Sequence, residues 1–125
     1  MARTRTTRRS AARARRIHGP DDSVQVELVV FGLRGARVVA LRDGDVVVVG
    51  RGPEADIRVN DSTVSRRHAR FERVGAYVWV SDAGSANGIW VAGKRVTRRR
   101  VRTLEALLLG ADSVATVRRP RRRRL

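Results

Sequence analysis

Short apolar runs alternate with turns through the middle of this chain. The runs are rich in β-branched residues, and most of them are followed by a turn that contains Gly, Asp or Asn, which is the pattern of strands joined by tight turns. They lie at residues 24–31, 36–41, 46–49, 56–59, 68–74, 77–80, 89–91, 94–96, 104–109 and 114–117. The run Val46–Val49 is continuously apolar, and this predicts a strand that is buried on both faces.

Helical periodicity is missing from the same region. No apolar pattern with helical spacing lasts the ~10–12 residues that identify a helix. Leu104–Leu109 is the one stretch that could be helical, but Gly110 ends it after six residues. Ten or eleven short, regularly spaced strands predict an all-β sandwich. We therefore expect one all-β domain at residues 23–117, between flanking segments 1–22 and 118–125.

Most of the formal net charge of +16 lies in the two flanking segments. Residues 1–22 contain seven arginines and two acids, and residues 118–125 contain six arginines and no acid. Residues 24–117 contain fourteen arginines, one lysine and ten acids, and are therefore much closer to neutrality. The segments have too few large apolar side chains to offset the entropy cost of ordering, so they are predicted to be disordered.

Composition excludes several kinds of chemistry. The chain has no cysteine, which excludes disulfides, thiol catalysis and cysteine zinc sites, and its two histidines, His18 and His68, are too few for a histidine-rich metal site. No apolar run approaches the ~18–20 residues of a membrane span, and the N-terminus has no apolar core of a secretory signal. We expect a cytoplasmic protein without metal, cofactor or membrane contact.

Ser65 and His68 raise the question of a hydrolase. The G-x-S-x-G motif of a nucleophilic serine is absent. Three residues apart at the start of a predicted strand, the two side chains are expected on opposite faces. A contact between them is better explained as a structural clamp of the loop, and we expect that the protein is not an enzyme.

Three polar motifs fall in loops between predicted strands: Gly50-Arg51, Ser65-Arg66-Arg67-His68 and Gly84-Ser85-Ala86-Asn87-Gly88. In a β-sandwich such loops can gather at one end. Together they provide a guanidinium fork, a hydroxyl donor, a second cation and a carboxamide. These are the groups that hold a phosphate and an extended peptide.

The order and spacing of these motifs, followed by Val91-Ala92-Gly93, resemble the forkhead-associated (FHA) family over nearly all of residues 24–117. The resemblance implies an eleven-stranded β-sandwich whose end loops bind phosphothreonine peptides. It implies that Arg51 and Ser65 hold the phosphate, that Arg66 adds charge beside them and that Asn87 bonds the peptide main chain. The residues implied to support the site are Gly50, His68 and Gly88.

The resemblance is incomplete in the third motif. The family usually has Ser or Thr before the Asn-Gly pair, where this chain has Ala86, and often Thr after it, where this chain has Ile89. Loss of one neutral hydrogen bond costs about 0.5–1.5 kcal/mol. A charge-assisted bidentate contact from Arg51 to phosphate is stronger than that, so binding is expected to survive.

Three functional hypotheses follow. The first is a phosphothreonine-binding signalling adaptor, whose partner is a Thr-phosphorylated protein such as a Ser/Thr kinase substrate or the kinase itself. The alternative is a protein whose sandwich is a scaffold and whose Arg-rich tails bind nucleic acid or another polyanion non-specifically. In the third, a phosphorylated threonine among Thr4, Thr6 and Thr7, which lie between arginines that basophilic kinases favour, binds the protein's own domain.

Overall fold

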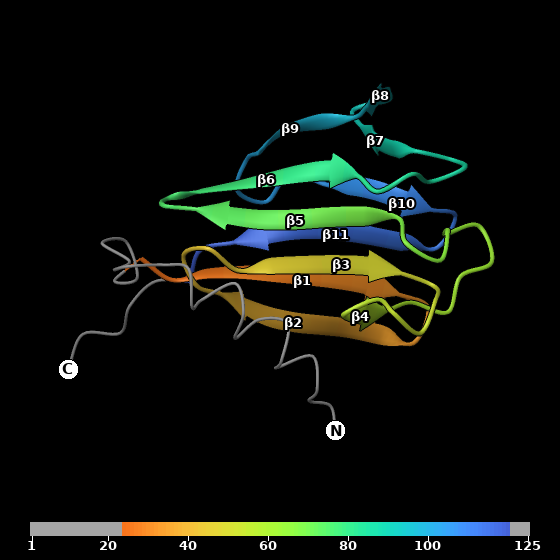
Figure 1. Ribbon diagram of the computed structural model, residues 1–125, viewed down its shortest axis with the longest axis horizontal. Coiled ribbons are helices and arrows are strands. Elements are labelled where there is room, and N and C mark those ends of the chain that lie inside the picture. The colour runs from red at the N-terminus through yellow and green to blue at the C-terminus, as the bar shows by residue number, and fades with distance from the viewer. Residues whose placement is uncertain (1–23, 121–125) are drawn as a thin grey trace.

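Eleven strands in two sheets make up the part of the chain that the computed structural model describes, residues 24–120 (Figure 1). The strands are β1 Val26–Gly32, β2 Gly35–Leu41, β3 Val46–Gly50, β4 Ile57–Arg58, β5 Ala69–Val74, β6 Tyr77–Asp82, β7 Ile89–Val91, β8 Lys94–Val96, β9 Arg98–Val101, β10 Leu107–Gly110 and β11 Ser113–Arg118. One sheet has the order β2-β1-β11-β10-β7-β8 and the other β4-β3-β5-β6-β9. The predicted all-β sandwich is confirmed.

Strand direction places the three polar motifs at one end of the sandwich. β4 runs parallel to β3, so both strands end at the same end of the sheet, with Gly50 beside Arg58. β5 is antiparallel to β3 and starts there, and β6 returns to the same end, with Ala69 paired to Asp82. The β3–β4, β4–β5 and β6–β7 loops therefore meet, at the right-hand end of Figure 1.

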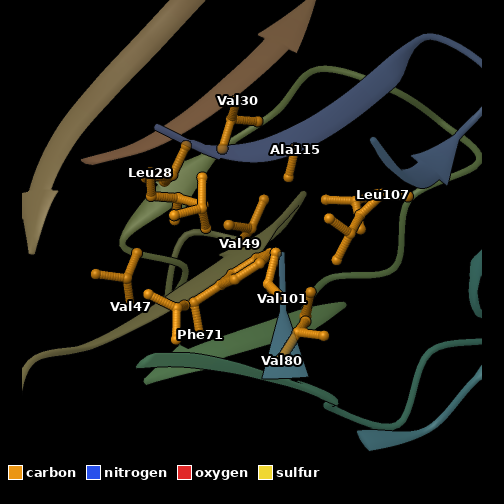
Figure 2. Close-up of a cluster of buried hydrophobic side chains, with 14 of the residues drawn as sticks. Leu28, Val30, Val47, Val49, Phe71, Val80, Val101, Leu107 and Ala115 are labelled. Carbon is orange, nitrogen blue, oxygen red and sulfur yellow. The ribbon is translucent and has the colours of Figure 1, made fainter. Parts of the chain in front are cut away.

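The core lies between the two sheets. Figure 2 shows side chains of both sheets facing one another; Leu28, Val30, Leu107 and Ala115 come from the six-stranded sheet, and Val47, Val49, Phe71, Val80 and Val101 from the five-stranded sheet. The predicted burial of Val46–Val49 holds for Val47, Val48 and Val49, while Val46 is half-buried. Within the described residues no helix is present that could span a membrane.

Strand β9 was not predicted from the sequence. Its residues Arg98, Arg99 and Arg100 have no apolar alternation, and only Val101 is buried. β9 is the edge strand of the five-stranded sheet, and it forms by pairing with β6. There the guanidinium carbons of Arg98 and Arg100 lie 4.4 and 4.3 Å from the ring centroids of Trp79 and Tyr77. Cation–π contact across the strands thus replaces apolar packing on this face.

Two sequence-based boundaries also differ from the structure. The apolar run Leu104–Leu109 is not helical: Leu104 has a φ of 64°, in the left-handed region, and β10 begins only at Leu107. The second boundary is at the end of β11, which continues one residue beyond residue 117, the predicted limit of the domain. β11 includes Arg118, whose Nε donates to Glu27 at 2.8 Å, and Arg119 Nε donates to Thr103 Oγ1 at 2.8 Å.

Stability should depend on Phe71, the largest apolar side chain that is fully buried. We expect Phe71→Ala to lower the free energy of unfolding by about 3–5 kcal/mol, because it removes buried surface and leaves a cavity. Val38→Ala is the control, since Val38 is 49% exposed on edge strand β2 and should change the value by less than about 0.5 kcal/mol. Urea unfolding measures both, and equal effects would contradict this view of the core.

Candidate functional site

The β3–β4 and β4–β5 loops are held together by main-chain hydrogen bonds. The amide of Arg51 donates to the carbonyl of Ser65 at 2.9 Å, and that of Gly52 to the carbonyl of Arg66 at 3.0 Å. Gly50 allows this approach, because a Cβ there would overlap the carbonyl oxygen of Arg66. The side chain of Arg51 is fixed as well, since its Nε donates to the carbonyl of Val64 at 2.9 Å. Arg51 and Gly52 thus make three hydrogen bonds to one neighbouring loop, two of them from Arg51.

His68 joins the second loop to the third. Its imidazole is fully buried; Nδ1 accepts the amide of Ser65 at 3.0 Å, and Nε2 lies 2.7 Å from the carbonyl of Gly88. Because Nδ1 accepts a hydrogen bond, the ring proton must be on Nε2, which donates to Gly88. The amide of Ala83 also donates to the carbonyl of His68 at 2.9 Å. His68 thus connects the loop that contains Ser65 to the loop that contains Ala83 and Gly88.

The geometry of the Ser65–His68 pair differs from the one expected. Ser65 lies in the loop before β5, which begins at Ala69, so the two side chains do not alternate along one strand. His68 contacts the amide of Ser65, whereas the hydroxyl oxygen of Ser65 accepts the amide of Ala86 at 3.0 Å. A serine that His68 does not contact at its hydroxyl lacks the base of a nucleophilic pair.

Asn87 makes a second bridge between the same two loops. Its Nδ2 donates to the carbonyl of Thr63 at 2.9 Å, and its own carbonyl accepts Trp90 Nε1 at 2.8 Å. The side chain is exposed, and no described residue donates to its Oδ1. Asn87 thus fixes the loop through one half of its carboxamide and presents the other half to solvent.

Asp82 and Ser85 shape the third loop from within. Asp82 Oδ1 accepts the amides of Gly84 and Ser85 at 2.9 and 2.7 Å, and Oδ2 accepts the Ser85 hydroxyl at 3.0 Å. Burial raises the pKa of Asp82, but the bonds from Ser85 and Gly84 outweigh it and lower the pKa. Ser85 Oγ in turn accepts the amide of Gly88 at 2.9 Å. Gly88 is required here, because its φ is 86°.

Asp61 anchors the second loop to the six-stranded sheet. Its Oδ1 accepts Thr63 N and Oγ1 at 2.9 and 2.6 Å, and its Oδ2 accepts Asp112 N and Ser113 Oγ at 2.9 and 2.7 Å. Thr63 Oγ1 also accepts the amide of Ala111 at 2.8 Å. The β4–β5 loop is therefore tied to the β10–β11 turn, on the opposite sheet.

The assembled surface suits an anion beside an extended chain. Arg51 and Arg66 are exposed and Ser65 is half-buried, and the Ser65 oxygen already accepts a bond, which leaves its O–H hydrogen for an incoming acceptor. Arg66 pairs with Glu54 at 3.7 Å, and both side chains are more than half exposed. Such a pair is worth about 0–1 kcal/mol, so a dianion can displace Glu54. No cluster of three or more His, Cys, Asp or Glu in residues 24–120 could hold a metal.

The structure thus brings together all seven residues predicted for the site: Gly50, Arg51, Ser65, Arg66, His68, Asn87 and Gly88. The model of the FHA domain family matches residues 47–110, just over half of the chain. The chain belongs to the FHA family. The matched range runs from β3 to β10 and contains every residue of this FHA site.

Solved FHA domains are similar over most of the chain. The FHA domain of CT664 from Chlamydia trachomatis has a TM-score of 0.70 and 26% identity, and covers 75% of this chain and 96% of its own. A structure from an analysis of phosphothreonine-dependent FHA domain interactions has a TM-score of 0.66 and 32% identity, and covers 75% of this chain and 95% of its own.

A curated relative matches a shorter stretch. The oxoglutarate dehydrogenase inhibitor of Corynebacterium jeikeium is 49% identical over 51 residues, which are 41% of this chain and 35% of the relative. The match spans about a third of the length of that relative.

Sequence reasoning missed the residues that hold the site in place. Asp61 and Asp82 were not among the predicted site residues, and Ser85 was named only within the third motif, without a role. Their signal is a short-range pattern: a carboxylate followed two or three residues later by Thr or Ser, which caps local amides. The pattern predicts a turn, but not that the carboxylate is buried or which distant strand it contacts.

Stability should also depend on the charge of Asp61. Burial raises its pKa, but the hydrogen bonds from Thr63, Ser113 and Asp112 outweigh burial and lower the pKa from 3.8 to about 2. The folded state therefore favours the carboxylate by about 2 kcal/mol. This contribution is complete above pH ~4 and is lost as the pH falls through ~2, because protonation then occurs in both states.

We expect Asp61→Asn to lower the free energy of unfolding at pH 7 by about 2 kcal/mol, because its amide group would face hydrogen-bond donors. Asp112→Asn is the control, since the Asp112 side chain is exposed and only its amide contacts Asp61. Urea unfolding between pH 7 and pH 3 should show that the difference in unfolding free energy between wild type and Asp61→Asn becomes smaller toward low pH. A difference that is independent of pH would contradict the charge-based explanation.

Proposed function

We propose that the loop end of this domain binds phosphothreonine in an extended segment of a partner protein, and that the protein acts as a non-enzymatic adaptor. The observation that supports this most directly is the placement of Arg51: its Nε is fixed by Val64, and no described residue accepts a hydrogen bond from its terminal amino groups. A planar guanidinium held in this way can give two parallel hydrogen bonds to a phosphate.

The other predicted residues have complementary roles in the proposal. Ser65 donates its hydroxyl to the phosphate, and Arg66 leaves Glu54 to add a second positive charge. Asn87 Oδ1 accepts a main-chain amide of the peptide, because Nδ2 is committed to Thr63. Unphosphorylated threonine lacks the ~−1.5 to −2 charge that these groups would meet. Binding is therefore switched on by a Ser/Thr kinase.

The proposed partner is a Thr-phosphorylated protein, either a kinase substrate or the kinase, in the cytoplasm. The similar solved structure from work on phosphothreonine-dependent FHA interactions supports the ligand class, and the name of the corynebacterial relative, an inhibitor, supports regulation rather than catalysis. Thr4, Thr6 and Thr7 and most of the Arg-rich tails lie outside the described residues. The self-binding and tail-based polyanion hypotheses remain predictions.

Binding should require the Arg51 fork. We expect Arg51→Ala to weaken binding of a phosphothreonine peptide library by about 10- to 150-fold, the loss of a hydrogen bond to a charged group. Arg51→Lys should recover only part of this, because lysine keeps the charge but not the bidentate geometry. A fluorescence-polarisation titration measures both variants.

The matched control for Arg51 is Arg102→Ala, which removes one exposed positive charge between β9 and β10, outside the three loops. It should leave peptide affinity unchanged. Thermal unfolding of each variant checks that the loop contact to Val64 is not needed for folding. Wild-type affinity in a folded Arg51→Ala variant would show that the phosphate does not bind at Arg51.

Restoring the hydroxyl typical of the family should strengthen binding. Ala86 is exposed, and its amide is already fixed by Ser65 Oγ. The loop is thus in place to present a side chain to the peptide. Ala86→Thr should tighten phosphopeptide binding about 2- to 12-fold, the value of one neutral hydrogen bond. Ala40→Thr, on the exposed edge strand β2, is the control and should have no effect; unchanged binding by Ala86→Thr would show that position 86 does not face the peptide, and weaker binding would contradict the expected gain.

A further inference from the structure

The outer face of the five-stranded sheet holds a group of residues that the phosphothreonine site does not use. Trp79 and Tyr77 on β6 lie across from Glu72 and Val74 on β5. Phe71 on β5 and Val78 and Val80 on β6 belong to the core, so alternate residues, among them Tyr77 and Trp79, face away from it. On the other side of β6, Trp79 pairs with Arg100 and Ser81 with Arg98.

Arginine and aromatic side chains on this face are layered. Arg98 lies over the Trp79 ring at 4.4 Å and Arg100 over the Tyr77 ring at 4.3 Å. No carboxylate in residues 24–120 forms a salt bridge with either arginine, whereas Arg99, which points the other way along β9, pairs with Glu105 at 3.1 Å. Tyr77 is 51% exposed. Two guanidinium groups thus lie over rings, and neither forms a salt bridge with a described carboxylate. We define Tyr77, Trp79, Arg98 and Arg100 as the arginine–aromatic face.

Charged side chains on β9 can be explained as protection of an edge strand from pairing with another chain. This does not explain why two aromatic side chains lie beneath the arginines. An edge strand needs only charged side chains in solvent, without rings beneath them. The Tyr77 ring is exposed and the Trp79 ring is half-buried, so together they add apolar surface to the outward side of β6, which a free-standing sheet face ordinarily avoids. Rings together with unpaired arginines are the combination that binds single-stranded nucleic acid, in which bases stack and phosphates meet cations.

We propose that the arginine–aromatic face is a second binding site, independent of the phosphothreonine site, for single-stranded nucleic acid. Arg98 and Arg100 are alternate residues of one strand and are therefore ~6.8 Å apart, a spacing comparable with that of successive phosphates along an extended strand. The guanidinium edges bind the phosphates, and bases stack on the guanidinium–ring layers. Base identity is not read, because the guanidinium edges are engaged by phosphates and stacking tolerates any base.

The test uses the full chain and a fluorescein-labelled thymidine oligonucleotide of about 12 nucleotides. Because the Arg-rich tails contribute attraction of their own, the comparison is between pairs of substitutions that remove the same charge. Arg98→Ala/Arg100→Ala should weaken binding about 10-fold and make the slope of log K against log salt shallower by about 1.4, the value for two lost phosphate contacts. The control pair, Arg34→Ala/Arg37→Ala, lies on the β1–β2 hairpin of the other sheet and is also exposed; it should change affinity less than about 2-fold.

Two further variants separate this site from its alternatives. Arg98→Lys/Arg100→Lys should keep the salt slope but lose part of the affinity, because lysine cannot stack. Arg51→Ala should leave oligonucleotide binding within about 2-fold while it weakens phosphopeptide binding by about 10- to 150-fold, so that failure of one proposal is distinguishable from failure of the other. Circular dichroism confirms that each variant is folded.

Two results would overturn the proposal. Equal losses for the two alanine pairs would mean that net charge and the tails, not this face, hold the oligonucleotide. Competition by poly-aspartate as effective as that by unlabelled oligonucleotide would mean that the face takes an acidic protein, since a peptide polyanion supplies charge but no bases to stack.

Discussion

The imidazole of His68 is the contact on which the geometry of the binding end depends. In this ring Nδ1 needs a hydrogen-bond donor and Nε2 needs an acceptor. Here the donor is the amide of Ser65 and the acceptor is the carbonyl of Gly88. A fully buried ring cannot replace either bond with water. The two loops therefore have one permitted separation, and this separation sets the Ser65 hydroxyl within reach of the Ala86 amide.

Rigidity at this end comes from polar groups because the loops have little apolar surface of their own. Asp61 and Asp82 each collect amides and hydroxyls of their own loop, and Asp61 also reaches the β10–β11 turn. A carboxylate that accepts several short-range bonds fixes a loop more tightly than scattered apolar contacts would. The β-sandwich supplies the fixed strand ends, and the carboxylates of Asp61 and Asp82 fix the loops that carry Ser65 and Asn87.

The sequence was sufficient to predict this fold wherever apolar residues recur. Valine-rich runs, glycine turns and the three loop motifs identified ten of the strands and the end at which the site lies. It was insufficient where polar side chains replace apolar packing. β9 was missed because Arg98 and Arg100 contact rings of a neighbouring strand. A pairing across strands cannot be recognised from the sequence of either strand alone.

The same limitation applies to the site. The motif containing Ser65 and His68 was recognised, but the expected alternation of the two side chains was wrong because Ser65 lies in the loop before β5. The order of residues also did not reveal that Arg51 Nε bonds Val64, that Asn87 bonds Thr63 or that Arg66 pairs with Glu54. These contacts depend on distances between loops, which only the strand registers determine.

The arginines of the folded part of the chain lie in several distinct environments. These environments explain how one small domain could distinguish a single phosphate group from a single-stranded nucleic acid. Arg70, Arg99 and Arg118 are paired with carboxylates, so they add little net attraction. Arg51 has one nitrogen committed and is directed by its loop, which suits a single phosphate of fixed position. Arg98 and Arg100 are spread on rings along a strand, which suits a repeating polyanion. Placement, more than the total of +16, therefore decides which ligand each arginine can bind.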